Sequence, residues 1–270
     1  GKGRSNIITL VNSFHGRTLC TLSATGQDVF HNYFFPFTEG FRYADANDLD
    51  SVKAQADDTT CAVMLELIQG EGGVLPLDKD FIQALAAWCQ ENDYLLLVDE
   101  VQTGVGRTGS LFCFQQYDIQ PDAVTFAKGI AGGLPMAGVM CSEKCRNVLG
   151  PGTHATTFGG NPIAAAGANV VLDELDDAML AEVNQKGEYL KSAIAAFDSP
   201  YVDTVRGMGL MIGIVLKEGV DRSALVKALY DHNLLVLTAG PKTIRLLPPL
   251  VISQEEMDTG LAALKDVLVP

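Results

Sequence analysis

The chain has 270 residues, of which 47% are hydrophobic and 19% charged, so it is long enough to bury a large core in one or two domains. Acidic residues outnumber basic ones 33 to 19, and the net charge of -14 disfavours a nucleic-acid partner, which would need clustered cations. No apolar run is long enough to span a bilayer, and no signal-peptide pattern opens the chain, so we expect a cytoplasmic, membrane-free protein.

The first half of the chain predicts an α/β fold with a mainly parallel sheet. A helix is expected after Asp78, because apolar residues from Phe81 to Cys89 recur at helical spacing. Strands that alternate with helices favour a parallel sheet, and continuous apolar runs are typical of strands covered on both faces. Such runs lie at residues 6–11, 61–65, 94–98, 123–126 and 137–141.

The second half is expected to form a long connecting helix and then a smaller α/β unit. Asn161 followed by Pro162 is typical of a helix start. Ser253 and Glu256 form a capping box at the start of the last helix. Further strands are expected near residues 210–216, 234–237 and 243–247, with a helix near 222–232. We therefore divide the chain at residues 1–165, 166–197 and 198–270.

The six cysteines do not form a metal-binding pattern. Only Cys141 and Cys145 are close in sequence, and no second pair or nearby histidine completes a zinc site. The cysteines lie scattered through apolar segments, which favours buried, reduced thiols. We therefore expect no bound metal.

Gly104, Gly106 and Gly109 have the spacing of a dinucleotide-binding turn after a predicted strand. Such a turn must open a helix whose N-terminus faces a pyrophosphate. Residues 110–117 show no helical apolar stripe, and no strand ending in an acidic residue follows about twenty positions later. This context disfavours an NAD oxidoreductase.

Asp99 and Lys128 each follow a predicted strand, at the sheet edge where open α/β folds bind ligands. A structural ion pair between Asp99 and an arginine such as Arg107 is one alternative, because an unpaired buried charge is costly. Lys128 lies in a segment without other charges, where desolvation would lower its pKa and make the neutral amine a nucleophile. Its alternative is a lysine that reaches from a strand end to water. Together, the two residues suggest pyridoxal 5'-phosphate, with a Schiff-base lysine and a carboxylate at the pyridine nitrogen.

Ordered motifs support this interpretation. Residues 64–74 (MLELIQGEGGV), 95–112 (LLLVDEVQTGVGRTGSLF), 121–135 (PDAVTFAKGIAGGLP) and 153–162 (THATTFGGNP) resemble the class III (subgroup II) pyridoxal-phosphate-dependent aminotransferases. Residues 12–27 (NSFHGRTLCTLSATGQ) are similar to the acetylornithine/ornithine aminotransferase branch. The resemblance covers essentially the whole chain.

The resemblance implies the pyridoxal-phosphate type I fold, with a large cofactor-binding domain and a small C-terminal α/β domain, in a homodimer with shared active sites. Lys128 resembles the lysine that bonds the cofactor and shuttles the substrate proton, and Asp99 resembles the partner of the pyridine nitrogen. His15 is expected to be structural or to support the site from behind. The other implied cofactor contacts are Phe14 and Val101 on the ring faces, Gln102 at the ring hydroxyl and Thr157 at the phosphate of the neighbouring subunit.

Three further residues are implied to bind the substrate. Arg17 resembles the arginine that grips a substrate carboxylate, which a bidentate guanidinium suits. Glu71 resembles a gate that pairs with Arg245 and releases it for the incoming oxo acid. Such a switch lets one pocket accept a donor first and a dianionic oxo acid second.

The implied reaction is amino transfer from N-acetylornithine to 2-oxoglutarate, giving glutamate and N-acetylglutamate semialdehyde in arginine biosynthesis. Ornithine or 4-aminobutyrate aminotransferase is the alternative within the family, and an inactive, cofactor-poor remnant is the alternative outside it. Two departures from the family pattern bear on this. Leu67 stands where the family usually has proline, and the family carries a substantial N-terminal portion, including a cofactor-phosphate cradle, before Gly1. The large domain is therefore expected to be incomplete at its start.

Overall fold

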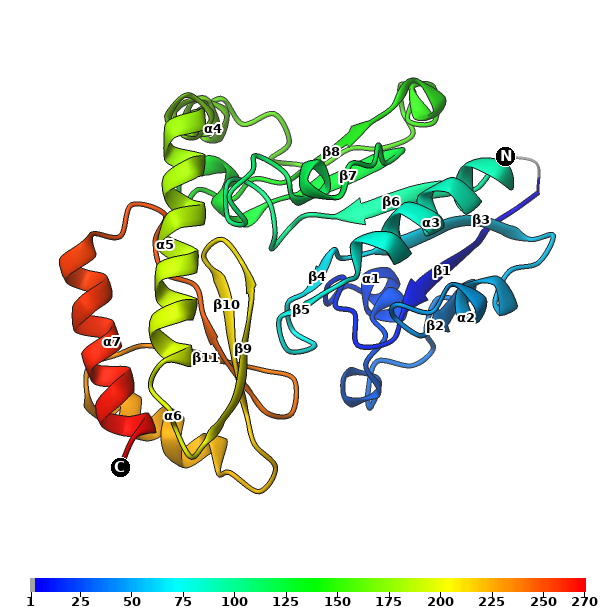
Figure 1. Ribbon diagram of the computed structural model, residues 1–270. Helices are drawn as coiled ribbons and strands as arrows, with labels where there is room; N and C mark the ends of the chain where they lie inside the picture. The colour runs from blue at the N-terminus through cyan, green and yellow to red at the C-terminus, as the bar shows by residue number, and fades with distance from the viewer. Residues whose placement is uncertain (1–2) are drawn as a thin grey trace.

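The computed structural model describes residues 3–270 and has two lobes, each built around its own sheet (Figure 1). The larger sheet has the strand order β2-β1-β3-β6-β7-β8, and the smaller one has the order β11-β12-β10-β9. A two-stranded hairpin, β4-β5, lies between them. The strands of the larger sheet and the hairpin are β1 (Asn6–Leu10), β2 (Phe41–Ala44), β3 (Thr60–Leu65), β4 (Ile68–Gln69), β5 (Leu75–Pro76), β6 (Leu95–Asp99), β7 (Ala123–Phe126) and β8 (Gly138–Cys141). Those of the smaller sheet are β9 (Val202–Met208), β10 (Met211–Leu216), β11 (Leu237–Ala239) and β12 (Thr243–Leu246).

Strands β1, β2, β3, β6 and β7 of the larger sheet run parallel, and only the edge strand β8 runs antiparallel to its neighbour. The registry places Leu97 beside Ala123 and Asp99 beside Thr125. Because the strands are parallel, the carboxyl ends of β1, β3, β6 and β7 meet along one edge. The predicted α/β class and mainly parallel sheet are confirmed.

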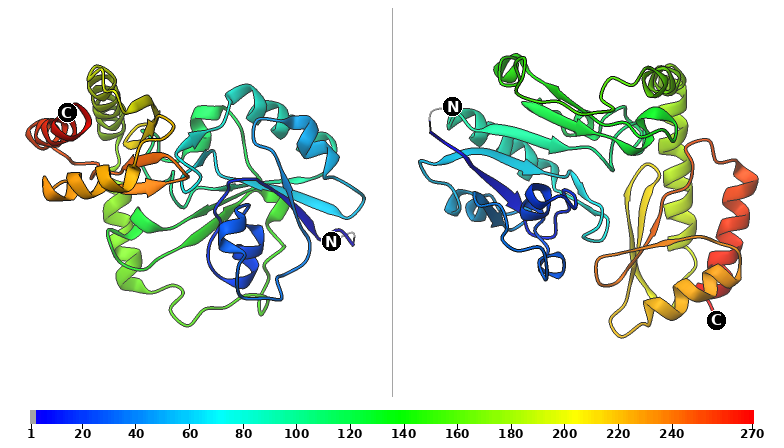
Figure 2. Two further views of the ribbon diagram at one scale, coloured as in Figure 1. Left: turned by 90° about the horizontal axis from the view of Figure 1, so that it is seen from below. Right: turned by 180° about the vertical axis from the view of Figure 1, so that it is seen from behind.

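Helices lie on both faces of the larger sheet (Figure 2). Helices α2 (Leu49–Ala54) and α3 (Lys79–Glu91) lie together on one face, and α1 (Leu19–Ala24) lies on the other. Cover is uneven, because Val139 and Met140 on β8 stay exposed.

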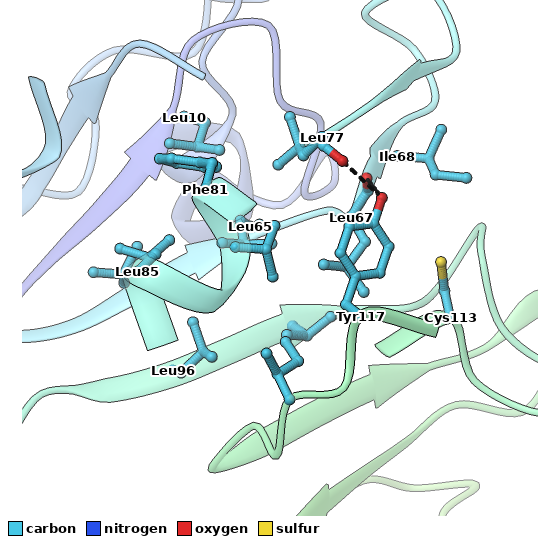
Figure 3. Close-up of a cluster of buried hydrophobic side chains, with 14 of the residues drawn as sticks. Leu10, Leu65, Leu67, Ile68, Leu77, Phe81, Leu85, Leu96, Cys113 and Tyr117 are labelled. Atoms are coloured by element: carbon cyan, nitrogen blue, oxygen red, sulfur yellow. Dashed lines mark hydrogen bonds between the residues drawn. The ribbon is translucent and has the colours of Figure 1, made fainter. Parts of the chain in front are cut away.

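The core of the large lobe is shown in Figure 3. Phe81 and Leu85 of α3 pack with Leu65 and Leu96 from the sheet. Tyr117, at the end of a short 3-10 helix (Cys113–Tyr117), is also buried there, and its hydroxyl donates hydrogen bonds to the carbonyls of Leu67 at 3.2 Å and Leu77 at 3.0 Å. A buried hydroxyl needs such partners, and these bonds tie the hairpin β4-β5 to the core.

The small sheet is antiparallel and has a covered face and a face turned toward the hairpin. Helices α5 (Asp177–Ala195), α6 (Arg222–Asp231) and α7 (Gln254–Leu268) contribute side chains to its core, together with β10, whose six residues are all buried. The predicted capping box of α7 is present, with Ser253 accepting from the Glu256 amide and Glu256 accepting from Ser253.

Several expectations about single elements need correction. The long helix after Asn161 is two helices, because α4 (Pro162–Glu174) ends at Leu175 and Asp176 caps a new helix by accepting a hydrogen bond from the Met179 amide. The strand expected at 234–237 is β11, which begins only at Leu237. Asp78 precedes α3 as expected, but its side chain makes no capping hydrogen bond. The division at residues 165 and 197 stays a prediction.

The cysteines are all free, as expected, but not all are buried. Cys89 and Cys113 are buried, whereas Cys20 and Cys141 are exposed and the other two are half-buried. An apolar neighbourhood in sequence does not fix burial where a helix end or an edge strand faces outward. Within residues 3–270, no helix is long and apolar enough to cross a membrane.

Candidate active site

The carboxyl edge of the larger sheet gathers the titratable residues that follow its central strands. His15 follows β1, Glu66 follows β3, Asp99 ends β6 and Lys128 follows β7. These strands are neighbours in the order β1-β3-β6-β7, so residues far apart in sequence meet at one place. The expectation that Asp99 and Lys128 lie at one sheet edge therefore agrees with the topology.

Asp99 is buried and fully engaged by hydrogen bonds. Its Oδ2 lies 2.8 Å from Nδ1 of His15, and its Oδ1 accepts from the Thr125 hydroxyl at 3.0 Å and from the Val101 amide at 3.1 Å. An ionised carboxylate can only accept hydrogen bonds, so the imidazole of His15 must carry a hydrogen on Nδ1. These three donors fix the orientation of the carboxylate at the edge of the sheet.

Lys128 begins a 3-10 turn (Lys128–Ala131) and has a left-handed backbone, with φ of 50°. Burial lowers the pKa of its amine, and the nearby carboxylates of Asp99, Glu71 and Glu66 oppose that shift. The residue as a whole is exposed. Within residues 3–270, no hydrogen bond or ion pair holds the Lys128 amine, which leaves it free to react.

Phe14 and Arg17 lie in the segment after β1. The guanidinium of Arg17 lies 4.5 Å from the ring centre of Phe30 and 5.7 Å from that of Phe14, as cation–π contacts. The two rings meet edge to face at 5.5 Å. The rings of Phe14 and Phe30 therefore pack against one face of the exposed Arg17 guanidinium, and its other face is available to an anion.

Glu66 is a buried carboxyl group that the sequence interpretation left without a role. Its Oε1 accepts from the Phe14 amide at 2.8 Å and its Oε2 accepts from the Gly70 amide at 3.2 Å. Burial raises its pKa to about 7, although the charge of His15 and the two amides act against the shift. This carboxyl group joins the Phe14 segment to the hairpin that carries Glu71.

Glu71 and Arg245 form an ion pair between the two lobes, as the resemblance implied. Nη1 of Arg245 lies 2.9 Å from Oε1 of Glu71 and also donates to Oε1 of Gln102 at 3.1 Å. The Arg245 side chain is 7% exposed and that of Glu71 is 31% exposed. Among the described residues, Nε of Arg245 is buried without a hydrogen-bond partner, so this cation has unused hydrogen-bonding capacity. The geometry suits an arginine that could exchange its carboxylate for another.

The three remaining predicted residues, Val101, Gln102 and Thr157, differ in their burial and contacts. Val101 follows Asp99 and is half-buried, and Gln102 packs against Gly70, whose missing side chain leaves the room it occupies. Thr157 lies in the exposed segment 151–161, and within residues 3–270 its side chain makes no hydrogen bond to the other candidates. Sequence reasoning assigned no role to Thr125 or Glu66, and it expected His15 to be structural or to support the site without naming Asp99 as its partner. Thr125 would have been the easiest of these contacts to predict from the sequence, since it lies directly beside Asp99 in the neighbouring strand.

Arg107 is not the partner of Asp99. Its Nη1 donates to the carbonyls of Leu210 at 3.2 Å and Pro248 at 2.6 Å, which belong to the small lobe. Burial lowers the pKa of its guanidinium. The ion-pair alternative fails because Arg107 points away from the sheet edge, across to the other lobe.

The three glycines after Asp99 allow close packing rather than nucleotide binding. Gly106 and Gly109 have φ of 82° and 84°, and a side chain at Gly109 would collide with Asn184 of α5. The amide of Asn184 donates to the Gly109 carbonyl at 2.8 Å. Residues 101–109 form turns and open no helix, so the dinucleotide interpretation lacks its essential element.

A mainly parallel sheet that presents a carboxylate and a lysine at its carboxyl edge, beside a second small sheet, has the architecture expected of the pyridoxal-phosphate type I fold. The sequence matches the aminotransferase class-III family over residues 1–268, and the chain belongs to this family of pyridoxal-phosphate-dependent enzymes.

Two curated relatives are called acetylornithine aminotransferase. The one from Haemophilus ducreyi is 47% identical over 269 residues, which cover 99% of this chain and 68% of the relative. The one from Streptococcus mutans is 48% identical over 270 residues, covering 98% and 70%. This chain thus spans about two thirds of the length of these relatives.

Two solved structures have the same fold. Ornithine aminotransferase from Toxoplasma gondii, described with partial occupancy of PLP at its active site, has a TM-score of 0.92 and 29% identity, covering 100% of this chain and 65% of its own. N-acetylornithine aminotransferase from Stenotrophomonas maltophilia has a TM-score of 0.82 and 36% identity, covering 99% and 66%. The predicted fold and family are confirmed.

The residues at the sheet edge fit the ring end of such a cofactor. Asp99 is oriented by three donors, Lys128 has a free amine, and the two groups are close enough for their charges to interact. In the part of the chain that the structure describes, Nε2 of His15 is buried beside them without a hydrogen-bond partner, so a polar atom at the site is left unpaired.

Proposed function

We propose that the protein transfers an amino group from N-acetylornithine to 2-oxoglutarate, giving glutamate and N-acetylglutamate semialdehyde, a step of arginine biosynthesis. The observation that carries the proposal is the Glu71–Arg245 pair, at 2.9 Å, close enough to Lys128 to shift its pKa. Relatives called acetylornithine aminotransferase, 41–48% identical, support the choice of donor.

Pyridoxal 5'-phosphate would be held by Lys128 and Asp99, with Phe14 and Val101 at the ring faces, Gln102 at the ring hydroxyl and Thr157 of a second subunit at the phosphate. When bound, the cofactor supplies an electron-withdrawing ring that stabilises negative charge on the substrate carbon. Asp99 keeps its carboxylate directed to one place because His15, Thr125 and the Val101 amide restrain it.

Lys128 is the residue that moves protons in this proposal. Its lowered pKa increases the fraction of neutral amine, and a neutral Nζ can take a proton from the substrate carbon and return it elsewhere. Of His15, Glu66, Asp99 and Lys128, only Lys128 is exposed and makes no side-chain hydrogen bond within the described residues. His15 is fully buried and bound to Asp99, so its part is to orient.

The two substrate arginines differ in a way that suits two substrates. Arg17 is exposed and stacked on aromatic rings, so it is available to the carboxylate of either substrate. Arg245 is neutralised by Glu71, which suits a donor that brings no second carboxylate. When the dianionic oxo acid enters, its carboxylate replaces that of Glu71 on Arg245.

A donor comparison tests this proposal. The chain is incubated with pyridoxal 5'-phosphate and 2-oxoglutarate, and glutamate production is measured with N-acetylornithine, ornithine and 4-aminobutyrate. We expect the highest kcat/KM for N-acetylornithine. A higher value for free ornithine, the substrate of the similar Toxoplasma gondii enzyme by its name, would replace the assignment with the second candidate. A colourless, inactive protein would support the cofactor-poor remnant.

We also propose a homodimer that shares its active sites. Helix α4 and the part of the chain from residue 134 that leads to it expose large apolar side chains, which protein interfaces often cover. Those exposed residues are Leu134, Val139, Met140, Val148, Leu149, Phe158, Ile163, Val170 and Leu172. Light scattering should give a dimer, and Ile163→Arg, which places a charge on this surface, should give a monomer. The cytoplasmic location expected from the sequence stays a prediction.

A further inference from the structure

The loop Gly70–Gly73 forms the tip of the hairpin β4-β5, and Glu71 is its one charged residue. If the proposed function is correct, the Glu71 carboxylate must leave Arg245 in one half of the reaction and return in the other. A loop on a flexible hairpin would move together with that side chain. The structure instead shows hydrogen bonds that hold the backbone of the loop from both lobes.

The small lobe holds two carbonyls of this loop. The amide of Gly240 donates to the Glu71 carbonyl at 2.7 Å, and Nη2 of Arg206 donates to the Gly73 carbonyl at 2.8 Å. Arg206 lies on β9, beside Gly213 of β10. These two bonds fix the loop over the small sheet without using the Glu71 carboxylate.

Arg206 and Arg245 flank the same residue of the small sheet. Both are registered opposite Gly213, one from each neighbouring strand, so their side chains leave the same face. Gly213 has no side chain between them, and a Cβ there would lie 2.9 Å from Cβ of Val74. The end of the loop therefore sits between two arginines, one bound to the Glu71 carboxylate and the other to the Gly73 carbonyl.

The large lobe holds the start of the loop. Oε2 of the buried Glu66 accepts from the Gly70 amide at 3.2 Å, while its Oε1 accepts from the Phe14 amide at 2.8 Å. The same carboxyl group therefore sets the start of the loop and the backbone of Phe14. Neither Glu66 nor Arg206 has been given a part in binding or chemistry.

The loop has a conformation that needs such support. Gly73 has φ of 129° and Val74 has φ of 53°, and a β-branched residue rarely adopts the left-handed region. Unusual backbone conformations persist where the surroundings determine them. Within residues 3–270, Arg206 pairs with no carboxylate, and its Nε is buried without a partner, so this cation is committed to a backbone carbonyl.

We propose that Arg206 and Glu66 are positioning residues, which hold the backbone of the loop Gly70–Gly73 still so that only the Glu71 side chain turns away from Arg245 and returns to it. The fixed backbone is inferred from the hydrogen bonds alone. Its consequence for catalysis rests on the proposed function. A fixed loop returns Glu71 to the same place after each turnover. This return is what keeps Arg245 neutral while the donor binds.

Hydrogen exchange tests the fixed backbone without any activity. Arg206→Ala, Arg206→Lys and the control Lys242→Ala are compared with wild type, using peptides that cover residues 66–75. We expect exchange in Arg206→Ala to be faster by at least about 10-fold, because a charge-assisted hydrogen bond is lost, and to be partly restored in Arg206→Lys. Lys242 lies on the same lobe with its side chain 42% exposed and pairs with Glu218, so its variant should match wild type. Unchanged exchange in Arg206→Ala overturns the proposal.

Single-turnover kinetics test the consequence in the full chain with pyridoxal 5'-phosphate. The donor half is measured with N-acetylornithine and the reverse half with L-glutamate. We expect Arg206→Ala to lower the ratio of kcat/KM for N-acetylornithine to that for L-glutamate by about 5-fold or more, through KM, with Arg206→Lys between it and wild type. An equal loss in both halves indicates a merely structural role and overturns the proposal. A wild type inactive in both halves contradicts the proposed function, while the exchange result still decides the fixed backbone.

Discussion

Asp99 and His15 form a buried pair in which Oδ2 of the carboxylate lies 2.8 Å from Nδ1 of the imidazole. The pair joins the segment after β1 to the end of β6, two strands separated in the sheet by β3. His15 is fully buried and Asp99 nearly so, which makes their mutual orientation a property of the fold. The carboxylate proposed to meet the cofactor is therefore set before any ligand binds.

Asp99→Asn should lower kcat/KM for amino transfer by about 10- to 150-fold. This range corresponds to a charged hydrogen bond worth about 1.5–3 kcal/mol, with little change in fold because the side chains have the same shape. Glutamate production and the melting temperature are measured together. The exposed Asp203→Asn is the control and should behave as wild type. Full activity in Asp99→Asn would contradict the assigned role.

Lys128→Arg should abolish amino transfer while the protein still folds, because arginine stays charged and cannot act as the nucleophile. Borohydride treatment of the wild type with the cofactor should leave a covalent adduct that peptide mass spectrometry maps to Lys128. Lys144→Arg, at a lysine beyond the sheet's opposite edge, serves as the control. An adduct on another lysine would contradict the assignment of Lys128 as the residue that bonds the cofactor.

Glu71→Gln should strengthen binding of 2-oxoglutarate by about 2- to 30-fold and weaken use of the donor. Arg245 then loses a partly buried ionic partner worth about 0.5–2 kcal/mol and is free for the oxo acid. Separate KM values for the two substrates reveal the effect. If both KM values rise together, Glu71 does not act as a gate.

Glu66 should make stability depend on pH. Its pKa is raised to about 7 from 4.5, so between these values the folded protein holds a proton that the unfolded chain releases. Stability therefore falls as pH rises from 4.5 to 7 and levels off above, by up to about 3 kcal/mol. Urea unfolding from pH 4.5 to 8 should show this fall in wild type and not in Glu66→Gln. The exposed Glu218→Gln should follow wild type, and parallel curves for all three would refute the effect.

Tyr117→Phe should lower the free energy of unfolding by about 1–3 kcal/mol, because the Leu77 carbonyl loses a buried donor. Tyr230 offers a matched control, since its hydroxyl donates to the Val236 carbonyl at 2.8 Å but the residue is exposed. Tyr230→Phe should cost less than about 1 kcal/mol. Similar losses in both variants would show that burial does not set the cost.

The sequence predicted the parallel strands and their edge well because apolar runs and chain order carry that information directly. Asp99 and Lys128 followed from it, since each comes immediately after a strand. The partner of Asp99 could not be read in this way, because His15 lies 84 residues away and the pairing depends on which strands are neighbours. Arg107 is close to Asp99 in sequence, but its side chain binds a carbonyl of the other lobe.

The family resemblance supplied Glu71 and Arg245 as a pair, and the structure brings them together across the lobes. Glu66 lies in the same motif as Glu71 but received no role from the sequence, because nothing in a sequence shows that a carboxyl group is buried between two amides. Leu67, which replaces the usual proline, is fully buried, and its carbonyl accepts from the Leu77 amide at 2.9 Å. The hairpin thus keeps its anchoring at this position.

The glycine-rich turn after Asp99 connects the two lobes through Arg107. It begins at the carboxylate on β6, and eight residues later Arg107 grips the carbonyls of Leu210 and Pro248. Leu210 directly precedes β10, the strand that lies between Arg206 and Arg245. A rotation of the small lobe would therefore act, through Arg107, on the segment that runs back to Asp99. Under the proposed function, a displacement of the small lobe near Arg245 would therefore also reach the carboxylate that is proposed to meet the ring nitrogen.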